Sequence, residues 1–351
     1  GAVTGRATSG DTITISNPAT GFSRTITVGA DGSYRFSQLP TGQYQISRNG
    51  AAPRNVTVNV GSAANIDFAG GDATTLDTVT VVGTGAINPI DVSSVESTTI
   101  LTAEQIAKIP VARDTTSVAL LAPGTVRRDA AFGNLASFGG SSVAENQYYF
   151  NGFNITNTFA NLNFAQVPFE AIAEQQVKTG GYGAEFGRST GGVINQISKR
   201  GTNEFHAGGS IFWSPDSLTE ALPSPYSNDG VLLADNSRNT GGDNLTAAVW
   251  ASGALVKDRL FAYGLVQWAK IDNDAFGGAG TNTSTQNSSK QPKWLLKMDW
   301  NISDNHILEF TALSDKRKNE TDYYSTTTDA DDVSNPMMTT YGGTDYNEFG
   351  G

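Results

Sequence analysis

The stretch VPFEAIAEQQVKTGGYGAEFGRSTGGVINQISKRGTNEFHAGGSIF, residues 167–212, decides the fold, because the character of the chain changes within it. Residues 180–192 contain six glycines, which allow positive φ angles and close backbone approach in a tightly folded segment. Val193, Ile194 and Ile197 then predict a short buried strand. After them the chain changes to long strand patterns separated by turns. A compact unit therefore ends, and an extended sheet begins, within this stretch.

The same stretch contains Gly187-Arg188-Ser189-Thr190-Gly191, which matches the G-x-S-x-G pattern of a hydrolase nucleophile elbow. Such an elbow requires a strand, a sharp turn and then a helix, whereas a strand pattern follows here. We therefore interpret these residues as structural and expect no enzymatic activity. The two histidines, His206 and His306, lack a neighbouring ligand pattern such as H-x-x-x-H, so we expect no metal site and no cofactor.

The stretch resembles the junction of plug and barrel in TonB-dependent outer-membrane receptors of the Oar-like branch. The resemblance rests on YGAEFGRSTGG at residues 182–192 and on KRGTNEFH at residues 199–206, which precedes the first barrel strand in those receptors. It implies a plug domain, a wide transmembrane β-barrel and a location in the outer membrane of a Gram-negative cell. Because a polar barrel lumen offers charged groups to pair with, we expect Glu185 and Arg188 to contact the barrel wall.

Composition predicts a mainly β protein with several domains. The 351 residues include 39 glycines and 12 prolines, with abundant Thr, Ser and Asn, which is typical of many strands joined by turns. The net charge of −11 argues against a nucleic-acid partner, because phosphate binding needs a basic face. There is no cysteine, which excludes disulfides and thiolate metal sites.

Residues 1–70 predict a small β-sandwich, because apolar and polar residues alternate in residues 12–15, 25–28 and 56–60. Residues 31–44, DGSYRFSQLPTGQY, resemble the signature of carboxypeptidase regulatory-like domains. In this resemblance such domains carry no chemistry of their own. We therefore expect a structural domain, which the resemblance places in the periplasm.

Residues 71–94 predict a linker with one isolated strand, formed by Leu76, Asp77, Thr78, Val79, Thr80, Val81 and Val82. An unpaired strand has free N–H and C=O groups and can bind another protein by adding to the edge of its sheet. The strand resembles the TonB box, which implies that these residues bind the periplasmic coupling protein TonB. The alternative is one more strand of the preceding sandwich, and the position before a plug favours the TonB box.

Residues 95–201 predict a small α+β plug. A strand pattern leads into a capping box, in which Thr102 and Gln105 satisfy the first backbone amides of a helix. A second short helix begins at Asp114 or Thr115. Strand, helix and helix in this order indicate a compact α+β unit.

Two loops of this plug are candidates for contact with cargo, because residues 132–138 and 158–164 are rich in Gly, Asn and Phe and are long for connectors. The candidate contact residues are Phe132, Asn134, Phe138, Phe159, Asn161 and Phe164. The alternative is that the phenylalanines pack the plug against the barrel wall. Between the loops, Asn151 and Gly152 suit a tight turn, although Oar-like receptors usually have Asp at position 151.

Residues 202–351 predict part of a barrel wall. Five strand patterns follow one another, near residues 203–213, 244–256, 259–271, 292–302 and 306–316. Long connecting segments, at residues 214–243 and 273–291, alternate with short turns, which is typical of outer-membrane barrels with short periplasmic turns. The acidic residues 329–332 are expected in an extracellular loop. Five strands cannot close a barrel, since the smallest have about eight and one around a plug about twenty-two, so we expect an incomplete chain.

The fourth of these strands predicts two different faces. Trp294, Leu296, Met298 and Trp300 lie on one face, which suits lipid, and Lys297 and Asp299 lie on the other, which suits a wet lumen. Leu295 breaks the polar face.

These features predict a mainly β fold with an N-terminal β-sandwich, an α+β plug and the first strands of a large transmembrane β-barrel. The resemblance implies a TonB-dependent receptor that moves a large substrate, such as a peptide, a protein or a glycan, across the outer membrane. Its expected partners are TonB, the lipid of the outer membrane and this substrate. The alternative is an outer-membrane adhesin or structural surface protein without active transport, which has no use for a TonB box.

Overall fold

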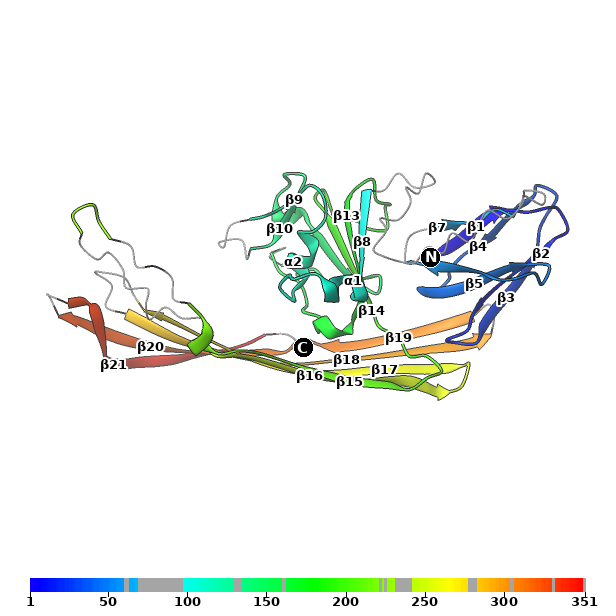
Figure 1. Cartoon of the computed structure of the whole chain (residues 1–351). Coiled ribbons are helices and arrows are strands. Elements are labelled where there is room, and N and C mark those ends of the chain that lie inside the picture. The colour runs from blue at the N-terminus through cyan, green and yellow to red at the C-terminus, as the bar shows by residue number, and fades with distance from the viewer. Residues whose placement is uncertain are drawn as a thin grey trace.

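The computed structural model describes residues 1–59, 63–68, 97–128, 134–159, 162–220, 223, 226–230, 242–276, 283–303, 306–329 and 332–349. The described chain is mainly β, as predicted. Figure 1 shows a long sheet with an α+β unit against its middle and a small β unit at one end. We call these units the wall (residues 206–349), the plug (residues 97–201) and the sandwich (residues 1–68). No described helix is long and apolar enough to cross a membrane.

The sandwich consists of two sheets of mainly antiparallel strands, which pack face to face around one core. The first sheet holds, in spatial order, β3 (Phe22–Thr27), β2 (Thr12–Asn17), β5 (Gly42–Arg48) and β6 (Arg54–Val58). The second holds β4 (Ser33–Phe36), β1 (Ala2–Arg6) and β7 (Ala63–Asn65). Every second side chain of a strand points inward, so Ile13, Ile15 and Ile46 are fully buried, and Tyr34 and Tyr44 lie in the same core.

The plug is built on a mixed five-stranded sheet. Its spatial order is β12 (Phe153–Asn154), β11 (Gln147–Phe150), β14 (Val193–Ser198), β13 (Ile172–Gly180) and β8 (Ser97–Thr102). Two helices, α1 (Ala103–Lys108) and α2 (Thr115–Ala119), and a hairpin of β9 (Thr125–Arg127) and β10 (Ala136–Phe138) complete it, with short 3-10 turns at Val143–Glu145 and Phe169–Ala171. The predicted helix starts are confirmed, because Thr102 and Gln105 form the capping box and Asp114 accepts from the amide of Ser117.

The wall is one antiparallel sheet whose strands follow the order of the chain. They are β15 (His206–Ser214), β16 (Asn244–Val256), β17 (Leu260–Phe276), β18 (Thr283–Ser303), β19 (His306–Ser314), β20 (Arg317–Asp329) and β21 (Asp332–Phe349), with a 3-10 turn at Asp216–Leu218 after the first. Two consecutive strands, β19 and β20, pair with successive parts of β18 and so continue one another. With 21 residues, β18 is about twice as long as a strand needs to be to cross a bilayer.

The five predicted wall strands are present, but the expected long loop at 273–291 is wrong, and the described wall has more than five strands. The segment 273–291, expected as a long loop, lies mostly within β17 and β18, and two further strands follow residue 316. Polar cross-strand pairs stabilise these extensions: Ser289 Oγ donates to Asn319 Oδ1 at 2.8 Å, and Thr321 Oγ1 donates to Asn287 Oδ1 at 2.7 Å. Strands with polar residues on both faces show no apolar alternation, so the sequence pattern resembles a loop.

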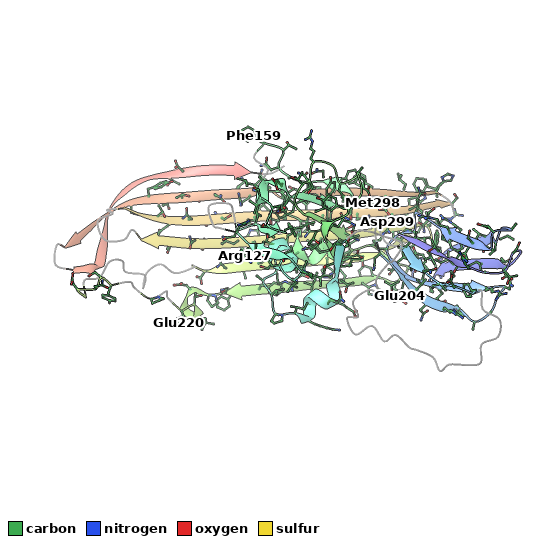
Figure 2. The ribbon with its side chains drawn as sticks, turned by 90° about the horizontal axis from the view of Figure 1, so that it is seen from above. Arg127, Phe159, Glu204, Glu220, Met298 and Asp299 are labelled. Atoms are coloured by element: carbon green, nitrogen blue, oxygen red, sulfur yellow. The ribbon has the colours of Figure 1, made fainter. Side chains whose placement is uncertain are left out.

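The predicted alternation along β18 is confirmed. Trp294 and Trp300 are exposed on one face of the sheet, whereas Lys297, Asp299 and Leu295 are buried on the face that the plug covers. Two oppositely directed neighbours, Met298 and Asp299, are labelled in Figure 2. The wall therefore offers an apolar outer face and a polar inner face.

Candidate functional site: the contact between plug and wall

Plug and wall meet in a group of four charged side chains. Arg200, two residues after the end of β14, donates through Nη2 and Nε to the carboxylate of Asp299 on β18, at 2.7 and 3.2 Å. The same guanidinium pairs with Glu309 on β19. Lys297 Nζ lies 3.0 Å from Glu309 Oε2 and 3.4 Å from Asp299 Oδ1. We call Arg200, Lys297, Asp299 and Glu309 the ion cluster.

Three members of this cluster are shielded from water, so the loss of one charged partner is costly. The side chains of Arg200, Lys297 and Asp299 are 18%, 3% and 6% exposed, so each charge depends on its partners instead of water. Burial by itself lowers the pKa of the Arg200 guanidinium, but the Asp299 carboxylate and then Glu309 more than offset it, so the pKa is raised above its ordinary value. The guanidinium therefore stays charged, and its bidentate contact with Asp299 fixes the end of the plug on the wall.

A second contact is centred on Glu170, in the 3-10 turn before β13. Arg113, from the loop between α1 and α2, pairs with its carboxylate, and Ser210 Oγ on β15 donates to Glu170 Oε1 at 3.1 Å. The hydroxyl of Tyr263 on β17 donates to the carbonyl of Glu170 at 3.3 Å. Arg113 also lies over the ring of Phe212 on the wall, 4.4 Å from its centroid. This contact ties the turn of the plug to the first and third wall strands.

A third contact is made by Asn151, in the tight turn after β11 (φ +49°). Its Nδ2 donates to Ser198 Oγ at 3.0 Å and to Thr311 Oγ1 on β19 at 3.1 Å, while its Oδ1 accepts from the amide of Ser198. An aspartate, which the resemblance leads one to expect here, could only accept from these hydroxyls when ionised, whereas the asparagine amide both donates and accepts. The amide side chain therefore suits a turn that must bind both the plug and the wall.

Between these polar contacts lies a small apolar patch. It joins Phe150, Val167 and Ala171 of the plug to Tyr263, Leu265 and Leu295 of the wall. Leu295, the one apolar residue on the predicted polar face, is thus explained by its contact with the plug. The plug is held mainly by polar and charged groups around a limited apolar contact.

The predicted cargo-contact residues fall into three groups. Phe138 and Phe164 are buried in the core of the plug, where Phe164 stacks on Tyr148 at 3.9 Å, so neither side chain can meet cargo or the wall in this conformation. Asn134 is exposed, and Phe159 is 98% exposed at the outer margin of the plug (Figure 2). Phe132 and Asn161 lie outside the described residues. Phe164 is buried by stacking on Tyr148, and Phe138 is buried where β10 packs in the core. Neither contact can be predicted from the composition of the loops.

The other predicted residues also lie apart from the plug-to-wall contact. Glu185 and Arg188 are exposed. The polar contacts with the wall that were expected of these two residues are made, within the described chain, by Arg200, Glu170 and Asn151 instead. Residues 76–82, the predicted TonB-binding strand, lie outside the described residues.

Ser189, the serine of the G-x-S-x-G pattern, makes hydrogen bonds within the plug. Ser189 Oγ lies 3.1 Å from the carbonyl of Glu145 and 3.2 Å from that of Gly192, and it accepts from the hydroxyl of Tyr182 at 3.0 Å. The segment after it enters β14, a strand, so the strand, turn and helix of a nucleophile elbow are not formed. Ser189 therefore fixes the glycine-rich segment to the plug.

Comparisons with known proteins agree on the two N-terminal units. Residues 1–70 match the family described as Carboxypeptidase regulatory-like domain, and residues 90–193 match the TonB-dependent Receptor Plug Domain. The chain is 30% identical over 273 residues to the TonB-dependent transporter Oar of Myxococcus xanthus, which covers 72% of this chain and 24% of that protein. The chain thus spans about a quarter of the length of this curated relative.

Solved structures with a similar arrangement include two receptors. One is the ferric enterobactin receptor PfeA of Pseudomonas aeruginosa, with a TM-score of 0.47 and 16% identity, over 65% of this chain and 38% of that one. The other is the siderophore receptor PirA of Acinetobacter baumannii, with a TM-score of 0.41 and 15% identity, over 73% of this chain and 44% of that one.

Proposed function

Because the chain belongs to the Oar-like TonB-dependent receptors of the outer membrane, we propose that it moves a large substrate, such as a peptide, a protein or a glycan, across that membrane with energy transmitted by TonB. The observation that carries the proposal is the plug seated on the polar face of the wall. Polar and charged contacts can be exchanged for contacts with water, whereas separating a large dry apolar interface exposes it at a high cost. A plug held in this way can leave the wall and return.

TonB binds, in this proposal, to the strand Leu76, Asp77, Thr78, Val79, Thr80, Val81 and Val82. The segment lies between the sandwich and the plug along the chain, so a partner bound there is connected directly to β8, the first strand of the plug. Strand addition needs main-chain groups rather than particular side chains, which fits the simple Thr and Val composition. We propose the corresponding division into residues 1–70, 71–94, 95–201 and 202–351.

The cargo meets the plug at its loops. Phe159 and Asn134 are the described candidates at the surface, and an exposed aromatic ring beside polar loop residues suits a peptide or a glycan surface. We assign no catalytic role to any of these residues.

The proposal is tested by a pull-down with the C-terminal domain of TonB. Val79→Pro removes a backbone N–H and bends the pairing strand, so its binding should weaken by about tenfold or more. Val79→Ala is the matched control, because it shortens the side chain and keeps the N–H, and it should bind nearly as well as the parent chain. Unchanged binding by the Pro variant contradicts the assignment of this strand.

The alternative function is that of an adhesin or structural surface protein without active transport. It is favoured if the parent chain itself fails to bind TonB in the same experiment. The loop that carries the exposed Phe159 would then be the adhesive element. Phe159→Ser would reduce binding to a surface, whether or not TonB is present.

A further inference from the structure

The sandwich rests on the end of the wall that carries the short turns. The amide of Asn203 donates to the carbonyl of Ala19 at 2.8 Å, and Asn203 exchanges two hydrogen bonds, of 2.7 and 2.8 Å, with Asp258 in the turn between β16 and β17. Gly21, at φ +66°, lies so close to this turn that a Cβ built on it would be 2.1 Å from Asp258 Oδ1. A glycine is therefore required where the sandwich meets the turn.

Another loop of the sandwich, residues 38–41, lies beside the ion cluster. A cavity of about 730 Å³ is lined by Leu39 and Pro40 of the sandwich, Ile197 and Arg200 of the plug, and Ile307 and Glu309 of the wall. Ile307 packs against the sandwich core, and Glu309, two residues later on the same strand, pairs with Arg200. Tyr44 of the sandwich also lies near this cluster. Burial raises the pKa of its phenol to about 12, and the positive charge of Arg200 opposes that rise.

This contact is suited to reversible docking. Its described hydrogen bonds are few and involve groups at the surface, and the cavity beside it leaves part of the interface unpacked. Polar interfaces of limited size between domains usually allow relative motion. The ion cluster, in contrast, depends on being covered, because an ion pair in water is worth little.

We propose that the sandwich is a latch on the plug. When docked, it covers the ion cluster and so holds Arg200 between Asp299 and Glu309. When undocked, it leaves the cluster open to water, and the plug is held less tightly on the wall. The way in which the latch is opened rests on the proposed function: residues 76–82 lie between the sandwich and the plug along the chain, so TonB bound there pulls on both.

Amide hydrogen exchange of the full chain tests the latch without TonB. Gly21→Ala places a methyl group against Asp258 and should undock the sandwich. The peptide of residues 196–201, which excludes the docking amide of Asn203 but contains the Lys199 amide bonded to Ala171, should then exchange about tenfold faster, as about 1.4 kcal/mol of lost free energy would produce. Unchanged exchange in this peptide overturns the proposal.

Gly10→Ala is the matched control. Gly10 also has a positive φ, of +87°, so the substitution causes similar backbone strain, but nothing lies within 4 Å of a Cβ there. It should leave residues 196–201 as protected as in the parent chain. Equal acceleration by both variants would mean that loss of sandwich stability, not undocking, opens the cluster, and would also overturn the latch.

A disulfide gives the opposite perturbation. The chain has no cysteine, so Gly21→Cys with Asp258→Cys provides the sole pair, and the Cβ built on Gly21 lies 2.9 Å from Asp258 Cβ, against about 3.5–4.5 Å in disulfides. A small shift therefore allows the bond.

Oxidation should slow amide exchange of residues 196–201 below the parent rate, and reduction should reverse this effect. Equal rates in the oxidised and reduced states overturn the latch. The pair Gly10→Cys with Asp258→Cys should not cross-link. Because TonB is absent, failure here leaves the TonB assignment untouched.

Discussion

At the scale of single residues, Arg200 connects the plug to two wall strands at once. Its replacement by Ala leaves Asp299, only 6% exposed, without its bidentate partner. Breaking a buried ion pair from one side costs about 3–5 kcal/mol, and Lys297 still faces Asp299 at 3.4 Å, so we expect the free energy of unfolding of the plug to fall by at most about that amount. Urea unfolding of the purified protein, followed by hydrogen exchange of plug peptides, measures the change.

The exposed partner supplies the control for this prediction. Glu309 is 42% exposed, so Glu309→Gln should cost about 1 kcal/mol or less. The raised pKa of Arg200 means that its contribution is fully present below the ordinary pKa of arginine and is lost only as pH rises through the higher folded value. The effect of Arg200→Ala should therefore be the same from pH 6 to pH 9. A loss no larger than that of Glu309→Gln would show that the cluster does not hold the plug.

Residue roles could be predicted from the sequence where they depend on close neighbours. The capping pair Thr102 and Gln105 is three residues apart and was found. The sequence does not predict the role of Arg200, because its partners Asp299 and Glu309 are 99 and 109 positions away and its own surroundings, KRGTN, have the composition of a linker. A lone apolar Leu295 on a polar strand face was the available signal that something packs there.

At the scale of elements, the outer face of β18 is expected to lie in lipid. Met298 lies between Trp294 and Trp300 on this face and pairs across the sheet with Ala262 and Phe310. Met298→Arg should cost about 2–4 kcal/mol if the position is near the middle of the bilayer. A denaturant titration of the protein in lipid vesicles measures this difference.

Met298→Leu is the control, since it keeps the volume and apolar character of the side chain and should change the free energy by less than about 1.5 kcal/mol. If Arg is tolerated as well as Leu, the outer face of β18 is in water and the assignment of the two faces is wrong.

Elements were predictable where one face is apolar. The alternation from Trp294 to Trp300 predicts the part of β18 with an apolar outer face, but not its continuation into residues 283–291, which consist mainly of Thr, Ser, Asn and Gln. Such residues form strands here because they bond across the sheet, and the partner strand, β20, was itself not recognised. A pattern based on burial does not detect a strand with water on both sides.

At the scale of the whole molecule, the sandwich should be able to fold by itself. Its core cluster is made by its own strands, and Ile307 is the one wall residue packed against it among the described residues. The isolated residues 1–68 should therefore unfold cooperatively on heating, with a free energy of about 3–5 kcal/mol as expected for so small a core. Circular dichroism at several wavelengths measures the transition.

A core variant makes this prediction specific. Ile46 is fully buried, so Ile46→Ala should remove about 2–5 kcal/mol and leave the isolated sandwich largely unfolded. If the parent sandwich has no cooperative transition, its fold depends on the wall, and undocking would then be unfolding.

The order of the units along the chain was predictable, but their placement was not. Composition and resemblance gave a sandwich, a plug and a wall, whereas the docking of Gly21 on Asp258 depends on two turns that are distant in sequence and carry no special pattern. Turn residues that touch another domain look the same in sequence as turn residues in water.

The length of β18 has one more consequence. Twenty-one residues at about 3.3 Å each extend roughly 70 Å, and a tilted strand uses roughly 33 Å of this to cross an apolar band about 25 Å tall. The strand ends on the side of the wall far from the sandwich (Figure 1) therefore rise roughly 25 Å above the hydrocarbon. Under the proposed function, a bulky cargo arriving from outside would meet these strand ends before it meets lipid.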